Sequence, residues 1–135
     1  MSRLRPFAIL IALAIPSSIG AQSTADMWGT ARPLTLTLSS FKFDPSEIVL
    51  EHGVRYDLHL VNTSSGGHDF AAKDFFARAQ IMPQDMAKVR SGSVEVGGGE
   101  SVELRLIAPA PGSYKLRCTH FMHGAFGMKG RIIVR

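Results

Sequence analysis

Disulfide bonds are the first feature that this sequence lacks. Its 135 residues contain one cysteine, Cys118, so no internal disulfide can form. A lone cysteine is often a small buried hydrophobic residue without a chemical role. A function for Cys118 therefore has to be argued from its neighbours in the sequence.

The sequence also lacks an apolar run long enough to span a bilayer, which takes about 20 residues. Its longest such run, residues 7–15, follows Arg3 and Arg5 and precedes small residues up to Ala21. A basic segment, a short apolar core and a small-residue exit are typical of a secretory signal peptide. We predict a Sec-type signal at residues 1–21, export to the periplasm and no stable membrane insertion after signal removal; an uncleaved anchor is the alternative. Cys118 is then a free thiol in an oxidising compartment.

Basic runs interleaved with aromatic residues are absent as well. Removal of residues 1–21 takes away two arginines and no acid, which lowers the formal net charge from +4 to +2 (13 basic minus 11 acidic residues). The remaining basic residues are scattered through strand-like segments. Because nucleic-acid binders carry a concentrated basic patch, we predict no nucleic-acid partner.

Alternation of apolar and polar residues is what the sequence has in abundance. It runs through residues 34–38, 54–60, 102–106 and 114–118, with a last apolar stretch at 132–134. A period of two is typical of half-buried strands, and Gly and Pro separate these segments as turns. The pattern predicts an all-β sandwich over residues 33–135, preceded by a flexible leader at 22–32.

One segment, around residues 71–91, departs from the alternation. Pro83 suits the first position of a helix, so we expect a short helical insertion here. Met82 and Met86 lie four residues apart and would form a face for a soft metal on an α-helix. Methionines more often fill gaps in a core, and we favour that interpretation.

The strongest local signal is a C-x4-H-x4-M arrangement in one loop, formed by Cys118, His123 and Met128. A thiolate, an imidazole and a thioether are soft or borderline ligands that favour copper over calcium, magnesium or manganese. Cys118 shares the alternation of its strand with Tyr114 and Leu116, so its side chain should point into the sandwich. The loop after it would then fold back over the same place. A fourth ligand has to come from elsewhere, and His68, in the loop after the strand ending near Asn62, is the best candidate.

At this point the sequence resembles the cupredoxin family of the plastocyanin and azurin type. The resemblance rests on Pro111-Gly112-Ser113-Tyr114, on the Cys118, His123 and Met128 series, and on the Gly-flanked last strand. Upstream, Asn62 and His68-Asp69-Phe70 resemble the family's first histidine strand. The match covers about 100 residues from Pro33 onwards and implies a cupredoxin-like Greek-key β-sandwich.

The resemblance implies a mononuclear type 1 (blue) copper site that cycles between Cu(I) and Cu(II). Its equatorial ligands would be His68, Cys118 and His123, with Met128 as a long axial ligand. Asp69 would support the site through a hydrogen bond from its backbone N–H to the Cys118 sulfur. Its side chain would reach Thr119 as an acceptor.

Two features of the loop depart from the family pattern. Many relatives have Pro-Gly before the second histidine, where this chain has Phe121-Met122. His120 is an extra imidazole two residues after Cys118. His120 or Met122 would compete for the copper or take a second ion, although the five-residue step to Met128 favours His123 as the ligand.

These features predict an exported one-electron carrier rather than an enzyme. We expect a monomer that meets a redox partner protein, and the apolar residues of the ligand loop (Phe121, Met122, Ala125 and Phe126) would form the docking patch or simply fill the loop. The main alternative is a periplasmic copper chaperone, buffer or resistance protein that exchanges copper with donor or acceptor proteins. A third possibility is an accessory domain of a membrane oxidase. A hydrolase with a Cys–His pair is disfavoured because an inward cysteine at a strand end, with Met128 in the same loop, fits copper better; zinc would not need the methionine.

Overall fold

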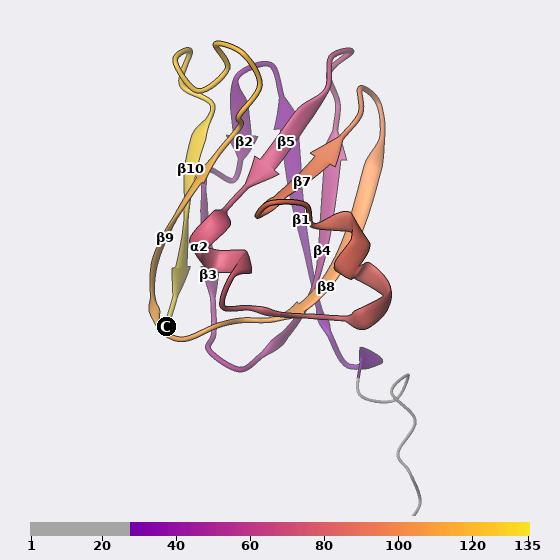
Figure 1. The fold of residues 1–135 in the computed structure, drawn as a ribbon, viewed down its shortest axis with the longest axis vertical. Helices are drawn as coiled ribbons and strands as arrows, with labels where there is room; N and C mark the ends of the chain where they lie inside the picture. Colours follow the sequence, from indigo (N-terminus) through magenta and orange to yellow (C-terminus); the bar gives the residue numbers. More distant parts are fainter. Residues whose placement is uncertain (1–27) are drawn as a thin grey trace, which may run out of the picture.

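The computed structural model describes residues 28–135, and these form two five-stranded sheets packed face to face (Figure 1). In spatial order the first sheet contains β2 (Lys42–Asp44), β1 (Arg32–Ser39), β4 (Arg55–Asn62), β8 (Ser101–Ile107) and β6 (Gln80–Ile81). The second contains β3 (Glu47–Leu50), β10 (Lys129–Val134), β9 (Gly112–Arg117), β5 (His68–Ala71) and β7 (Ser93–Val96). The predicted β-sandwich is confirmed.

The predicted signal peptide at residues 1–21 and the first part of the predicted leader, residues 22–27, lie outside the described residues. The end of the leader is described, and β1 begins at Arg32, one residue before the predicted boundary. Among residues 28–135, no helix has the length and apolar character needed to cross a membrane.

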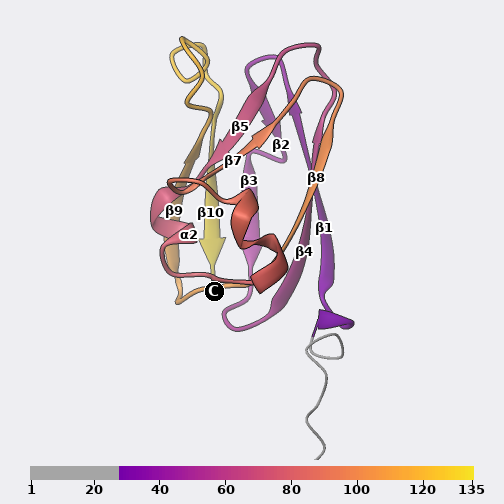
Figure 2. The same cartoon turned by 45° about the vertical axis from the view of Figure 1, so that its right-hand side comes forward.

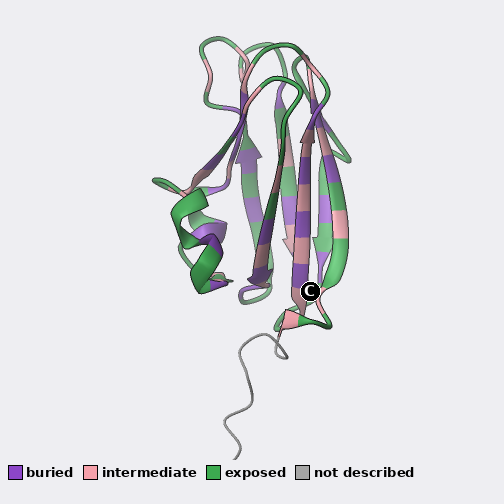
Figure 3. Cartoon of the chain, turned by 90° about the vertical axis from the view of Figure 1, so that its right-hand side faces the viewer, coloured by how far each residue is buried: buried purple, intermediate pink, exposed green. Residues whose placement is uncertain are grey.

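The alternation in the sequence becomes the division between core and surface. In β9, Tyr114 and Leu116 are buried while Lys115 and Arg117 are exposed. Figure 3 shows the same change from buried to exposed residues along the other strands. Each large apolar side chain taken from water into this core stabilises the fold by about 1.5–3 kcal/mol. The two inner faces therefore hold the sheets together.

Strand pairing places both ends of the C-terminal loop at one end of the sandwich. Strands β9 and β10 pair antiparallel, with Arg117 opposite Lys129 and Tyr114 opposite Ile132. The loop of residues 118–128 joins them and lies at the end of the sandwich that also carries the β1–β2 turn (Figure 1). The predicted ligand loop is thus a hairpin connection with both ends held by a strand ladder.

The helical insertion lies where it was predicted. It consists of α2 (Lys73–Phe76), the short strand β6 and a 3-10 helix, η1 (Pro83–Lys88), which Pro83 opens as expected. Figure 2 shows this segment along one side of the sandwich, away from the end that carries the 118–128 loop. Core packing is the right interpretation for Met82, which is 5% exposed, and the wrong one for Met86, which is 60% exposed. The two side chains share no face because the helix is 3-10 rather than α.

Asp85 ties the insertion to the sandwich. Its carboxylate is buried and accepts hydrogen bonds from the backbone N–H and Nε of Arg105, at 3.0 and 2.9 Å, and from Lys88 Nζ at 2.7 Å. Burial alone would raise the pKa of Asp85, but the bonds from Arg105 and Lys88 outweigh it and lower the pKa to about 2. The charged form is therefore the one that stabilises the fold.

We expect Asp85→Asn to lower the free energy of unfolding at pH 7 by about 1–2 kcal/mol, because the folded state loses a charged acceptor that the unfolded chain does not need. The contribution of Asp85 is fully present above the unfolded pKa, near 4, and is lost as the pH falls towards about 2. Urea unfolding across that range should show a shallower acid loss for the variant. Asp74→Asn, at an exposed acid, is the control, and equal pH dependence in all three proteins would contradict the assignment.

Candidate metal centre

Cys118 continues the inward series of β9 by one residue and is buried, as its strand position predicted. Its backbone N–H donates to the carbonyl of Met128 at 3.1 Å, and the N–H of Met128 donates to the carbonyl of His123 at 3.0 Å. Gly127, with a φ of 96°, allows the chain to turn back before Met128. The loop therefore brings the three residues of the C-x4-H-x4-M motif together by backbone bonds alone.

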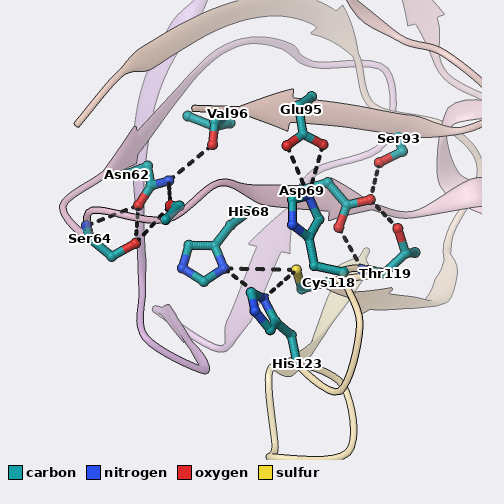
Figure 4. Close-up of polar contacts among 12 residues, drawn as sticks. Asn62, Ser64, His68, Asp69, Ser93, Glu95, Val96, Cys118, Thr119 and His123 are labelled. Carbon is teal, nitrogen blue, oxygen red and sulfur yellow. Dashed lines mark hydrogen bonds and ion pairs between the residues drawn. The ribbon is translucent and has the colours of Figure 1, made fainter. Parts of the chain in front are cut away.

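His68 reaches the same place from another part of the chain. It is the first residue of β5, whereas the sequence placed it in the loop before that strand, and it is buried. A buried Asn62 fixes that loop: its Nδ2 donates to the carbonyls of Gly66 at 2.8 Å and Val96 at 3.0 Å, and its Oδ1 accepts from the backbone N–H and hydroxyl of Ser64 (Figure 4). His68 therefore begins its strand at a fixed position.

Three donor atoms converge between the two segments (Figure 4). The Nδ1 atoms of His68 and His123 lie 3.1 Å apart, and the Cys118 sulfur lies 3.9 Å from the first and 3.4 Å from the second. Their mutual distances stay within 4.8 Å. Two imidazole nitrogens and a sulfur that face one another in this way present lone pairs to a common point, which is the arrangement of a metal site.

Met128 completes the neighbourhood from the side of β10. Its side chain is fully buried, and its backbone is bonded to both Cys118 and His123. A thioether is a weak, soft donor that suits a long bond to copper and has no use at a calcium or magnesium site. Its burial beside two other predicted ligands gives it a place in the same cluster.

Burial of the cluster favours the uncharged forms of His68 and Cys118. Burial lowers the pKa of His68, and the facing rings of His123 and His120 lower it further, so the neutral imidazole is favoured. Burial raises the pKa of the Cys118 thiol, against which hydrogen bonds from the backbone N–H groups of Asp69 and His120 act. The net pKa is raised, so the metal-free site favours the thiol, and metal binding displaces its proton to give the thiolate.

Asp69 links the two segments that carry the cluster. Its carboxylate accepts hydrogen bonds from the backbone N–H and hydroxyl of Thr119 and, at 2.6 Å, from the hydroxyl of Ser93. The sequence predicted the contact with Thr119 but missed Ser93. Burial raises the pKa of Asp69, and the bonds from Ser93 and Thr119 more than offset it, so the net pKa is lowered and the carboxylate is ionised. It holds the residues next to His68 and Cys118 at a fixed separation.

The two departures from the family pattern lie beside the cluster, outside the group of converging donors. The His120 ring stacks on that of His123, with centroids 5.4 Å apart and planes at 25°. Its Nε2–H donates to the Glu95 carboxylate at 2.8 and 3.0 Å, away from the three converging atoms. Met122 is half-exposed and has a φ of 64°.

Phe41 belongs to the site, and the sequence analysis missed it. It lies in the β1–β2 turn with its ring edge-on to His123, centroids 5.2 Å apart, and 5.1 Å from Phe126. A large aromatic residue at the tip of a turn was the available signal, since such a position is normally polar. Only the fold reveals that this turn and the ligand loop lie at the same end.

The fold and the donor cluster of this chain have counterparts in a known protein family. A family profile described as a cupredoxin-like domain matches residues 7–134, almost the whole chain. The chain belongs to the cupredoxin family. A comparison with curated proteins finds no match. Cupredoxins take copper as their cofactor, and the soft and borderline donors gathered here fit one copper ion.

Solved structures share the cupredoxin fold at low sequence identity. Reduced auracyanin of Roseiflexus castenholzii is 23% identical with a TM-score of 0.59, and the match covers 79% of this chain and 99% of that one. Auracyanin A of Chloroflexus aurantiacus, described as a "blue" copper protein, is 20% identical with a TM-score of 0.53, covering 76% and 99%. McoA multicopper oxidase of Aquifex aeolicus matches at 16% and 0.61, but the match covers 30% of its chain and 79% of this one. These solved structures share their fold with this chain.

Asn62→Ala should lower the free energy of unfolding by about 2–4 kcal/mol, because it leaves the carbonyls of Gly66 and Val96 without their donors. The measurement is urea unfolding of the metal-free protein, which separates this effect from metal binding. Thr63→Ala serves as the control, since its exposed hydroxyl makes only a long bond of 3.4 Å. A loss for Asn62→Ala no larger than that of the control would show that the loop is held by other contacts.

Proposed function

We propose that this cupredoxin is an exported one-electron carrier of the periplasm, without enzymatic activity of its own, and that it holds a single type 1 copper ion. His68, Cys118 and His123 are its equatorial ligands and Met128 its axial ligand. The observation that carries the proposal is the convergence of two imidazole nitrogens and one thiolate sulfur within 4.8 Å in a buried position. Copper, when bound, supplies the one-electron couple between Cu(I) and Cu(II).

The protein's own contribution is to hold the donors still. Cys118 and Met128 sit at the base of a hairpin and His68 on a neighbouring strand, and Asp69 bonds across to Thr119 between them. Ligands fixed by two strands and a buried carboxylate move little when the charge on the metal changes. Such rigidity favours electron transfer over reactions that need an open coordination position.

An apolar surface surrounds His123, the most accessible of the four proposed ligands. We define the apolar rim as the exposed side chains around it: Phe41, Phe121, Met122 and Phe126. Phe121 is 91% exposed and Phe126 62% exposed, which excludes mere filling of the loop as their role. Exposed apolar patches of this kind mark sites of protein association. The apolar rim is the surface on which we place the encounter with a redox partner.

Copper handling remains the second candidate, and one observation favours it: His120 and Met122 add an imidazole and a thioether beside the proposed ligands. His120, however, is bonded to Glu95, and among residues 28–135 the four-ligand group contains the one cluster of three or more His, Cys, Asp or Glu donors. A copper titration separates the two functions. One ion per chain that apo-acceptor proteins cannot remove supports the carrier, and a second Cu(I) supports the handler.

Copper-loaded protein should show an intense visible absorption from thiolate-to-copper charge transfer, together with a reversible one-electron couple. Cys118→Ser should lose the band entirely because serine offers no thiolate. His120→Ala should keep both, since it is not among the proposed ligands. Absorption and EPR spectra with voltammetry are the measurements. A colourless Cu(II) protein would disprove the type 1 assignment.

Phe121→Glu should slow electron self-exchange between oxidised and reduced copies about tenfold or more, because two apolar rims that carry like charges then have to meet. The reduction potential should stay almost unchanged, since Phe121 is solvent-exposed. NMR line broadening of mixed-valence samples gives the rate. Val49→Glu, which places the same charge on an apolar residue in another strand, is the matched control. Equal slowing by both variants would remove the rim as the docking surface.

A further inference from the structure

A groove of about 950 Å³ lies on the face of the second sheet that points away from the core. Its floor includes Asp69 and Ala71 of β5 and Thr119, which follows Cys118. Its walls come from the start of α2, from the turn before β7 and from the end of η1. The groove therefore brings together elements that lie far apart in the sequence.

Five basic side chains line this groove, and we call it the basic groove: Lys73, Lys88, Arg90, Lys115 and Arg117. Lys88 is paired with Asp85. Among residues 28–135, no carboxylate lies within ion-pair distance of the other four. Charges that look scattered along the chain are thus concentrated in one concave place.

The acids of the groove do not cancel this charge. Asp69 is buried and already accepts three hydrogen bonds, and Glu95 is bonded to His120. Asp74 is the remaining carboxylate in the lining. The lining as a whole holds five cations against three carboxylates, so the groove keeps a positive excess inside a concavity, which attracts an anionic ligand.

The groove also contains the last strand of the second sheet. Strand β7 is the last in its sheet, bonded to β5 on one side and to no strand on the other within the described chain. Ser93, Val94 and Glu95 of β7 line the groove. On that side Ser93 already exchanges two backbone hydrogen bonds with Arg90, at 2.8 and 3.0 Å, so the edge offers little free backbone. Recognition in the groove therefore depends on side-chain charge.

We propose that the basic groove binds an extended acidic segment of a partner protein, with its carboxylates on Arg90 and Lys115. The size of the groove, far above the roughly 30 Å³ of a water molecule, suits a peptide better than a single small anion. Cations on separate walls suit a narrow chain between them better than a flat membrane surface. The occupant would lie against Thr119, one residue from Cys118. The relevance of this short separation to electron transfer rests on the proposed copper function, whereas binding of the segment does not.

The test is an NMR titration of the Cu(I)-loaded and the metal-free protein with a short glutamate-rich peptide. The amides of Ala71, Ser93 and Thr119 should shift, and affinity should fall about tenfold when salt rises from about 0.02 M to about 0.2 M. Arg90→Glu with Lys115→Glu should weaken binding about tenfold or more, and Arg90→Lys with Lys115→Arg should retain it. Arg78→Glu with Arg135→Glu applies the same change of charge outside the groove and should have little effect.

Three results would overturn the proposal. Equal loss in the control pair would mean attraction by net charge alone. Shifts around the apolar rim in place of β7 would assign the peptide to the other surface. Binding of anionic lipid vesicles that depends on Arg90 and Lys115, without binding of the peptide, would assign the groove to a membrane. Because metal-free protein is titrated in parallel, and the visible band is recorded on the copper-loaded sample, failure of the groove and failure of the copper assignment are separate outcomes.

Discussion

The pairing of β9 with β10 is the constraint on which the proposed metal centre depends. Arg117 stands opposite Lys129, so the residues next to them, Cys118 and Met128, have to lie side by side at the base of the loop that joins the two strands. The hydrogen bond between their backbones extends the ladder by one step. Because both ends of the intervening loop are held, the loop has to turn back on itself. The hydrogen bond from the N–H of Met128 to the carbonyl of His123 then keeps His123 near Cys118. One soft-ligand pair is therefore set by strand register, before any metal binds.

Register also explains which parts of the site could be predicted from the sequence. Alternation along a strand is local, so the inward direction of Cys118 follows from Tyr114 and Leu116 alone. The spacing to His123 and Met128 is local too. His68 needed the family resemblance, because nothing local brings β5 to the end of β9. The five short strands β2, β3, β5, β6 and β7 have two to four residues each, too few for alternation to identify them securely.

The residues that the sequence could not assign are those whose roles depend on contacts across the fold. Asn62 holds the carbonyl of Val96, 34 positions away, and Ser93 donates to Asp69 across 24 positions. Phe41 contacts His123 from the N-terminal third of the chain. The basic groove has the same origin. Lys115 and Arg117 point outward at alternate positions of β9, and only the fold brings the turn that carries Arg90 to the same hollow. A list of charges along the chain shows them as scattered because it contains no information about these neighbours.

The apolar rim and the basic groove differ in physical character, yet one chain of contacts joins them. Glu95 lines the groove and accepts the hydrogen bond from His120, and His120 stacks on His123, which the rim surrounds. An acidic segment in the groove brings negative charge towards Glu95 and its attachment to His120. Association at the apolar rim, in contrast, would depend on apolar contact, which salt weakens little. The extra histidine, which the sequence left open as a competing ligand, thus acquires a structural role: it supports the ring of His123 from the side of the groove. A line of direct contacts, from Glu95 through His120 to His123, thus connects the groove with the proposed ligand that faces the rim.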